Sequence, residues 1–140
     1  MSEDVKLPPE IDRWSQQLVL DPRSKVFAQL ADAYRRTGML DEAIETCKRG
    51  IEHNPAFATG HLVLGRCYLA TKMYALAMEE FQLVVKSDPQ NLAGYKMLAT
   101  ICEQQGQNDQ AVKYYRMILD LEPGETEISE RIEKLTGQTG

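Results

Sequence analysis

A repeat of 34 residues constrains the fold of this chain more strongly than any other feature of its sequence. Three prolines that each follow an acidic or amide residue mark the repeat, at Pro55, Pro89 and Pro123. Seven sets of residues in one register predict three structural units of equal length. The six further sets related by the same interval are Leu30, Leu64 and Leu98; Ala31, Gly65 and Ala99; Ala43, Ala77 and Ala111; Phe27, His61 and Tyr95; Tyr34, Tyr68 and Cys102; and Cys47, Phe81 and Tyr115.

Each of the three units, which span residues 24–57, 58–91 and 92–125, is predicted to form two helices. In the first unit, Gly38 separates two apolar patterns, and Asp41 is expected to be the N-cap of the second helix. Both patterns have the spacing of one apolar helix face. Their residues are Phe27, Leu30, Ala31 and Tyr34 in the first helix, and Ala43, Cys47, Gly50 and Ile51 in the second.

The second unit departs from this pattern at its central turn. Lys72 replaces the turn glycine, and Ala75 replaces the capping aspartate. We expect this turn to form but to be less well capped than the other two. Because no unit can bury its apolar face alone, we expect the three units to stack into one continuous core.

The segments on either side of the three units are also expected to be helical. Residues 9–23 carry an amphipathic pattern, and they predict a degenerate half repeat or, alternatively, a free helix that docks onto another protein. Residues 126–136 have a narrow apolar stripe among charged residues, which predicts a C-terminal capping helix. Residues 1–8 and 137–140 are expected to be a flexible N-terminus and a frayed tail. The amphipathic pattern of the first segment consists of Ile11, Trp14, Leu18 and Val19.

The length, helix–turn–helix form and closing proline of the units over residues 24–125 resemble the tetratricopeptide repeat (TPR) family. The resemblance implies an all-α fold, a right-handed α-solenoid of three TPR helix-turn-helix repeats with an N-terminal half-repeat helix and a C-terminal capping helix. It also implies binding of other proteins. It does not identify the partner, because this family is defined by its architecture.

The sequence contains no pattern that predicts catalysis. No HExxH, GxSxG, P-loop or GxGxxG motif occurs, and no group of cysteines and histidines has the spacing of zinc ligands. His61 occupies the position of Phe27 and Tyr95, so we expect it to be a packing residue. The three cysteines are widely spaced and are expected to be buried thiols of a reducing compartment. We therefore predict no enzyme, no cofactor and no metal site.

The charge and hydrophobicity of the chain exclude further classes of function. The net charge of −5 argues against nucleic acid as the main partner, since phosphate binding requires a basic surface. No apolar run approaches the roughly 20 residues that span a bilayer, and the N-terminus lacks the pattern of a secretory signal. A cytoplasmic location is therefore expected.

The resemblance implies that the first helix of each unit lines a concave surface. On these helices, apolar residues that neither core requires are expected to form the centre of a peptide-binding site with a basic rim. This predicts a partner peptide or helix with an apolar anchor and acidic flanks. The predicted site residues are the apolar Leu62, Val63, Leu69 and Met97, the basic Arg35, Arg36, Arg66 and Lys96, and Thr100.

Two alternatives to this binding site remain open. The terminal helix, or another segment, could fold over the same surface. The module could also be structural, forming a homo-oligomer or docking within a larger TPR assembly.

Some members of the family hold the C-terminal carboxylate of chaperones with lysine, asparagine and arginine side chains. None of these residue types is present at the five matching positions, so we predict that chaperone tails are not bound by this mechanism. The residues at these positions are Ala28, Asp32, Val63, Ala93 and Met97.

Overall fold

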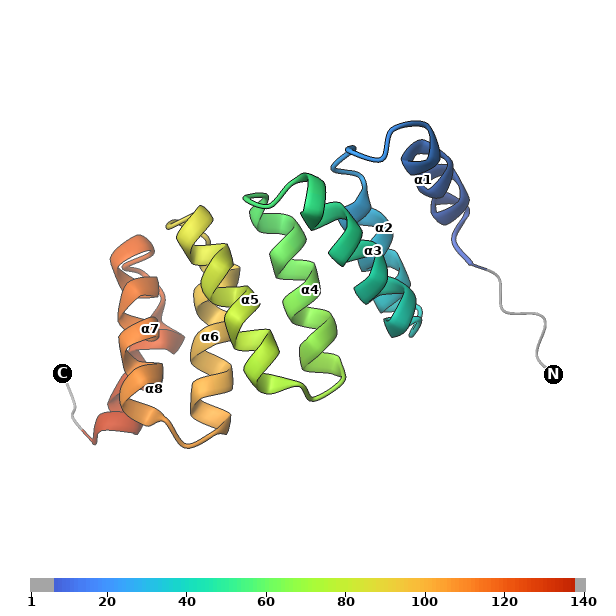
Figure 1. Ribbon diagram of the computed structural model, residues 1–140. Helices are drawn as coiled ribbons and strands as arrows, with labels where there is room; N and C mark the ends of the chain where they lie inside the picture. The colour runs from blue at the N-terminus through green and yellow to red at the C-terminus, as the bar shows by residue number, and fades with distance from the viewer. Residues whose placement is uncertain (1–6, 138–140) are drawn as a thin grey trace. The chain divides into compact units, whose positions relative to one another are not determined.

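The computed structural model describes residues 7–137, and these residues form α-helices without any strand (Figure 1). The prediction of an all-α chain is confirmed. The segments predicted to be a flexible N-terminus and a frayed tail lie mostly outside the described residues. The helices are α1 (Pro9–Leu20), α2 (Phe27–Arg36), α3 (Leu40–His53), α4 (Ala58–Ala70), α5 (Tyr74–Ser87), α6 (Leu92–Gln104), α7 (Asn108–Leu121) and α8 (Thr126–Thr136).

The chain divides into two compact units, unit 1 (residues 1–80) and unit 2 (residues 81–140), and the division falls inside α5. In unit 1, α2 packs against α1, α3 and α4, and α3 also packs against α4. In unit 2, α6 packs against α7, and α7 packs against α8. The helices of the pairs α2/α3 and α6/α7 lie side by side within their own unit (Figure 1).

The turns that close α2, α4 and α6 share one hydrogen-bonded geometry. Gly38, Lys72 and Gly106 all have a left-handed backbone, with φ of 83°, 62° and 76°. In the first turn the amide of Met39 donates to the carbonyl of Tyr34 over 2.8 Å, and the other two turns repeat this bond at the same distance. This is the Schellman arrangement, which satisfies the last carbonyls of a helix. The expectation that the Lys72 turn forms is confirmed, although its residue has a Cβ.

The expected N-cap of α3 is wrong. The helix begins at Leu40 with Met39 at the N-cap position, and no side chain caps it. Asp41 lies inside the first turn, where its carboxylate faces the positive end of the helix dipole. The same residue type therefore acts on the helix terminus through charge rather than through a capping hydrogen bond.

Two glycines make room for one aromatic ring in the core of unit 1. A Cβ on Gly50 would lie 2.0 Å from the ring of Phe27, and a Cβ on Gly60 would lie 2.6 Å from its Cζ. The ring also packs edge-on against Phe57, with 5.9 Å between the ring centroids. The contact ties α2 to both α3 and α4, because the two glycines belong to these helices.

The first helix is packed onto unit 1. Ile11 of α1 is buried in a cluster with Leu30 and Ala33 of α2, and Trp14 and Leu18 pack against this cluster. One residue of the predicted apolar pattern does not take part, because Val19 is 81% exposed. α1 ends at Leu20, before a turn at Asp21 and Pro22.

Candidate functional site

The predicted site residues of unit 1 lie on α2 and α4, two helices that contact each other. Leu62, Arg66 and Leu69 on α4 are half-buried, so part of each side chain is accessible. Val63 is a correction to the prediction, because only 4% of it is exposed in a helix that packs against both α2 and α3. It supports the packing of α4 and offers almost no surface to a guest.

The arginines of unit 1 differ in how far they are already neutralised. Asp32 accepts a hydrogen bond from Arg35 at 2.8 Å and forms an ion pair with Arg36 at 3.2 Å. These are the i, i+3 and i, i+4 spacings of neighbouring side chains on one helix. Arg66 of α4 has no hydrogen bond or ion pair with any residue that the structure describes. The positive charge that is free to meet a ligand in unit 1 is therefore concentrated at Arg66, whereas Arg36 of α2 is exposed but paired with Asp32.

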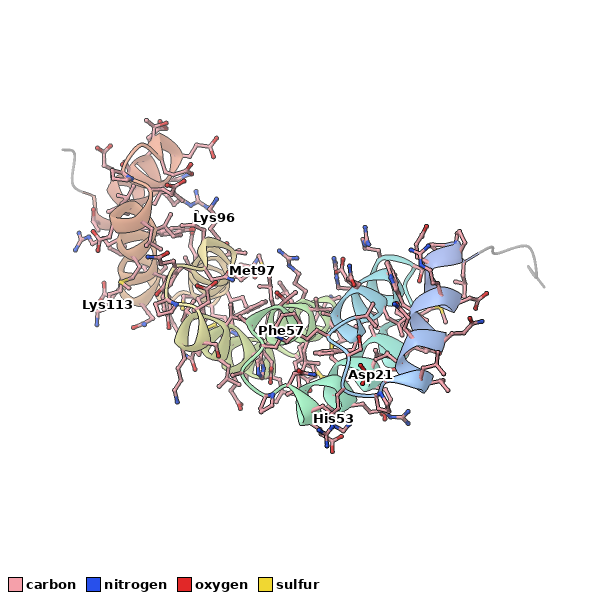
Figure 2. All side chains as sticks on the ribbon, turned by 90° about the horizontal axis from the view of Figure 1, so that it is seen from above. Asp21, His53, Phe57, Lys96, Met97 and Lys113 are labelled. Atoms are coloured by element: carbon pink, nitrogen blue, oxygen red, sulfur yellow. The ribbon has the colours of Figure 1, made fainter. Side chains whose placement is uncertain are left out.

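The predicted site residues of unit 2 lie on α6. Lys96 and Thr100 are exposed and Met97 is half-buried. Figure 2 places Lys96 and Met97 on α6 and Lys113 on α7, on different sides of this helix pair. Thr100 also borders a polar recess of about 210 Å³ that reaches Tyr115 of α7 and Arg131 of α8.

A charged cluster that the sequence analysis missed connects α8 to α6. The guanidinium of Arg131 donates through Nε to Glu103 at 3.0 Å, and one of its terminal nitrogens forms an ion pair with the same carboxylate at 2.6 Å. The hydroxyl of Tyr115 donates to the same carboxylate at 2.7 Å. Burial and the bond to Glu103 raise the pKa of Tyr115, so the phenol stays protonated. Arg131 follows Met97 by 34 residues, and this interval was the signal that could have revealed it.

The cluster bears on the alternative that the terminal helix covers the candidate surface. α8 reaches Glu103 near the C-terminal end of α6. Lys96 and Thr100 nevertheless remain exposed. Within unit 2, therefore, α8 does not cover the exposed residues of α6 that the sequence analysis selected.

His61 is a buried packing residue, as expected, with both ring nitrogens bonded. Its Nε2 lies 2.6 Å from the carbonyl of Pro55, and its Nδ1 lies 2.8 Å from Glu80. Tyr95 occupies the same repeat position and donates its hydroxyl to the carbonyl of Pro89 at 3.0 Å. The two side chains thus perform the same structural task in successive repeats.

The thiols are buried. Cys47, Cys67 and Cys102 are free cysteines with no exposed surface. Burial raises the pKa of Cys102, which disfavours the reactive thiolate. Among residues 7–137, no group of three or more histidine, cysteine, aspartate or glutamate side chains could hold a metal ion. In the same range, every helix is too short or too polar to cross a lipid bilayer.

The five positions of the chaperone carboxylate clamp contain no free cation. Ala28 and Val63 are buried, and Ala93 and Met97 are half-buried. Asp32 is negatively charged and already pairs with two arginines. A peptide carboxylate would therefore meet neither a lysine nor an asparagine at any of these places.

Comparison with known proteins gives consistent family matches. Two models described as tetratricopeptide repeat match the chain, one over residues 35–102 and the other over residues 95–129. Small glutamine-rich tetratricopeptide repeat-containing protein 2 of Mycosarcoma maydis is 32% identical over 67% of this chain and 27% of its own length. The Hsp70-Hsp90 organizing protein of Triticum aestivum is 28% identical over 65% of this chain and 16% of its own length. The chain thus spans less than a third of either relative.

Solved structures resemble the whole repeat region. The crystal structure of MamA aligns with a TM-score of 0.80 and 20% identity, over 91% of this chain and 75% of MamA. The first TPR of Spaghetti (RPAP3) bound to HSP90 peptide SRMEEVD aligns with a TM-score of 0.74 and 22% identity, over 83% of this chain and 92% of the other. At these identities the likeness establishes the fold, and the predicted solenoid class of helical repeats is confirmed.

Proposed function

We propose that this chain, which belongs to the tetratricopeptide repeat family, is a non-catalytic adaptor that binds a peptide or helix of another protein through its first-helix surface. Membership of this family of interaction modules also confirms the prediction that the chain is not an enzyme. Within unit 1, the surface consists of the accessible predicted residues of α2 and α4. The proposed guest has an apolar anchor and acidic flanks.

One observation on α4 carries the proposal. Leu62 and Leu69 are half-buried apolar residues, and Arg66 between them has no acceptor among the described residues. Leu62, Arg66 and Leu69 follow each other at steps of four and three, so they share one face of the helix. An apolar stripe with a central unpaired cation suits an apolar side chain flanked by a carboxylate.

The structure narrows the predicted charge preference. Asp32 neutralises part of the Arg35 and Arg36 charge, so a long acidic run has no matching basic run on α2. We propose that acidic groups of the guest act mainly at Arg66. Arg66→Glu should slow association with the guest and weaken the dependence of the association rate on salt. The matched variant Arg116→Glu, at an exposed position of α7, should have neither effect.

Binding of labelled peptides measured by fluorescence anisotropy tests the proposal. The probes are an amphipathic peptide with a leucine anchor and aspartate flanks, and the same peptide with lysine flanks. The acidic peptide should bind more tightly, and Leu62→Asp should weaken it about tenfold or more. Leu83→Asp, an exposed apolar residue of α5, is the matched control and should have no effect. Equal affinity for both peptides, or equal loss in both variants, would contradict the proposal.

The names of relatives that bind chaperone tails do not determine the partner of this chain. The solved neighbour described above holds an HSP90 peptide ending in EEVD. The clamp positions of this chain lack the cations for a terminal carboxylate, because they hold alanine, valine, methionine and an already paired aspartate. We propose that the guest is recognised by its side chains and not by its free C-terminus.

A further inference from the structure

Two of the free cysteines meet in the core of unit 1. Cys47 belongs to α3 and Cys67 belongs to α4, and these two helices lie side by side (Figure 1). The thiol of Cys47 donates a hydrogen bond to the sulfur of Cys67. Neither residue has any exposed surface. The contact therefore joins the second helix of the first repeat to the first helix of the next repeat.

The repeat does not require thiols at these two places. Side chains of other types occupy the positions that lie 34 residues away, where they serve as buried packing residues. These residues are Phe81 and Tyr115 for Cys47, and Ala33 and Ile101 for Cys67. Packing alone can therefore be achieved without sulfur, and the meeting of two thiols adds a chemistry that the fold does not need.

The two thiols differ in how readily they lose a proton. The hydrogen bond from Cys47 lowers the pKa of Cys67; burial opposes this effect, and the positive charge of Arg35 supports it. The same hydrogen bond and burial raise the pKa of Cys47. Because the thiolate is the nucleophilic form of cysteine, Cys67 is the sulfur that reacts first, with a protonated Cys47 beside it.

We propose that Cys47 and Cys67 form a reversible oxidation site, at which a small peroxide converts the two thiols into a disulfide between α3 and α4. The buried position of both sulfurs selects the oxidant. A protein oxidant needs an exposed sulfur, whereas hydrogen peroxide is small enough to enter during local opening of the helices. Cys102 of unit 2 is also buried, and burial raises its pKa, so it reacts more slowly.

The reaction proceeds in two steps. The Cys67 thiolate attacks one oxygen of hydrogen peroxide, the O–O bond breaks, and the departing hydroxide takes up a proton to become water. Cys67 is then a sulfenic acid. The sulfur of Cys47 attacks the sulfur of Cys67, the S–O bond breaks, and the hydroxyl group leaves as water with the proton of Cys47. Two thiols and one peroxide thus give one disulfide and two molecules of water, and a thiol reductant reverses the oxidation.

Mass spectrometry of the folded chain after treatment with hydrogen peroxide tests the site. The intact chain should lose the mass of two hydrogen atoms, and a non-reducing digest should contain one peptide pair linked through Cys47 and Cys67. Dithiothreitol should restore the original mass. Three free thiols after prolonged treatment, or a disulfide that includes Cys102, would overturn the proposal. This measurement on the native chain does not depend on whether any variant folds.

Alanine variants test the order of the two steps. Cys47→Ala leaves Cys67 without a second thiol, so oxidation should stop at the sulfenic acid, which dimedone labels after the chain is unfolded in urea. Cys67→Ala should leave Cys47 reduced over the same time. Cys102→Ala is the matched control and should form the disulfide at the native rate. Labelling of Cys47 in Cys67→Ala as fast as that of Cys67 in Cys47→Ala would contradict the assignment of Cys67 as the nucleophile.

Urea unfolding shows whether the disulfide belongs to the native packing. A bond between Cys47 and Cys67 restricts the unfolded chain, so the oxidised Cys102→Ala variant should unfold at a higher urea concentration than the same variant after reduction. A lower midpoint in the oxidised form would mean that the bond forces α3 and α4 out of their native contact, and it would overturn the proposal.

Discussion

His61 and Glu80 form a hydrogen-bonded pair in unit 1 that stabilises the doubly protonated imidazole. Nδ1 lies 2.8 Å from the Glu80 carboxylate, and Nε2 lies 2.6 Å from the carbonyl of Pro55. Both neighbours are acceptors, and both ring nitrogens donate in the charged form. The bond to Glu80 raises the pKa of His61, with smaller contributions from Pro55 and from the charge of Glu80, and these outweigh the opposing effect of burial.

The free energy of unfolding should therefore depend on pH in a defined direction. The folded-state pKa of His61 lies above its value of about 6.5 in an unfolded chain. The contribution of the charged pair is complete below pH 6.5 or so and is lost as the pH rises through the folded-state pKa. Urea denaturation at several values between about pH 6 and about pH 9 should show a free energy of unfolding that declines as the pH rises.

Glu80→Gln is the matched control for this pH dependence. A glutamine can donate its amide to Nδ1 of a neutral imidazole while Nε2 still donates to Pro55, so every bond is retained. The stability of this variant should change little over the same pH range. An equally steep decline in native protein and variant would assign the pH dependence to other groups.

Lys72→Gly should stabilise the protein by about 1 kcal/mol. Lys72 has φ of 62°, a left-handed conformation in which its Cβ approaches the following carbonyl oxygen. Glycine adopts this conformation freely, and part of the gain is offset by its larger entropy in the unfolded chain. The midpoint of urea unfolding should rise without a change in slope.

The reverse substitution at an equivalent turn provides the comparison. Gly106 has φ of 76°, and a Cβ there would meet no atom within 4 Å. Gly106→Ala should therefore destabilise unit 2 through backbone strain alone, by about 1 kcal/mol. If neither substitution moves the midpoint, the left-handed turns are not strained.

The repeat pattern predicts the helices, because residues at positions related by 34 residues make the same packing contacts in every unit. Ala31, Ala43 and Ala99 all have no exposed surface, as expected for sites where helices approach closely. The Lys72 turn follows its neighbours, because it makes the same hydrogen bond from the amide of Met73 to the carbonyl of Tyr68 despite the preference of a single residue. The helical architecture can therefore be predicted from the sequence wherever one position of the repeat has the same structural role in every unit.

The candidate surface was less predictable, because its residues occupy positions of the repeat that have no fixed structural role. Val63 has the spacing of an exposed residue, yet α4 is apolar on most of its sides and packs against two helices of unit 1. Arg131 and Glu103 are 28 residues apart in the sequence, and they form their hydrogen bond only when α8 is packed in unit 2. Val19 fits an amphipathic pattern but lies at the edge of the packed stripe, so α2 does not cover it.

Gly50→Ala should destabilise the protein by about 1–3 kcal/mol, the usual range for an overpacked core. The new Cβ would lie 2.0 Å from the ring of Phe27, and that ring is also confined by Gly60. Urea unfolding followed by circular dichroism measures the loss. Gly124→Ala is the control, because a Cβ at this exposed glycine would have no neighbour within 4 Å.

A second substitution separates overpacking from the intrinsic effect of alanine. Phe27→Leu removes the ring that the new methyl group meets, so the double variant should lose less stability than the sum of the two single variants. Strict additivity would mean that Gly50 and Phe27 do not compete for the same space.

An EEVD-ending chaperone peptide should bind this chain without any dependence on its free C-terminal carboxylate. Four of the five clamp positions hold alanine, valine or methionine, and the fifth is Asp32, which already pairs with Arg35 and Arg36. The acidic side chains of such a peptide can still meet Arg66, which has no partner among the described residues. Calorimetric titration with the peptide SRMEEVD and with its C-terminal amide should give weak affinities within about twofold of each other, because the two ligands differ only at a group with no cation to receive it. Both affinities should fall with added salt and in Arg66→Glu. Tight binding that disappears on amidation would show that a carboxylate clamp exists despite these residues.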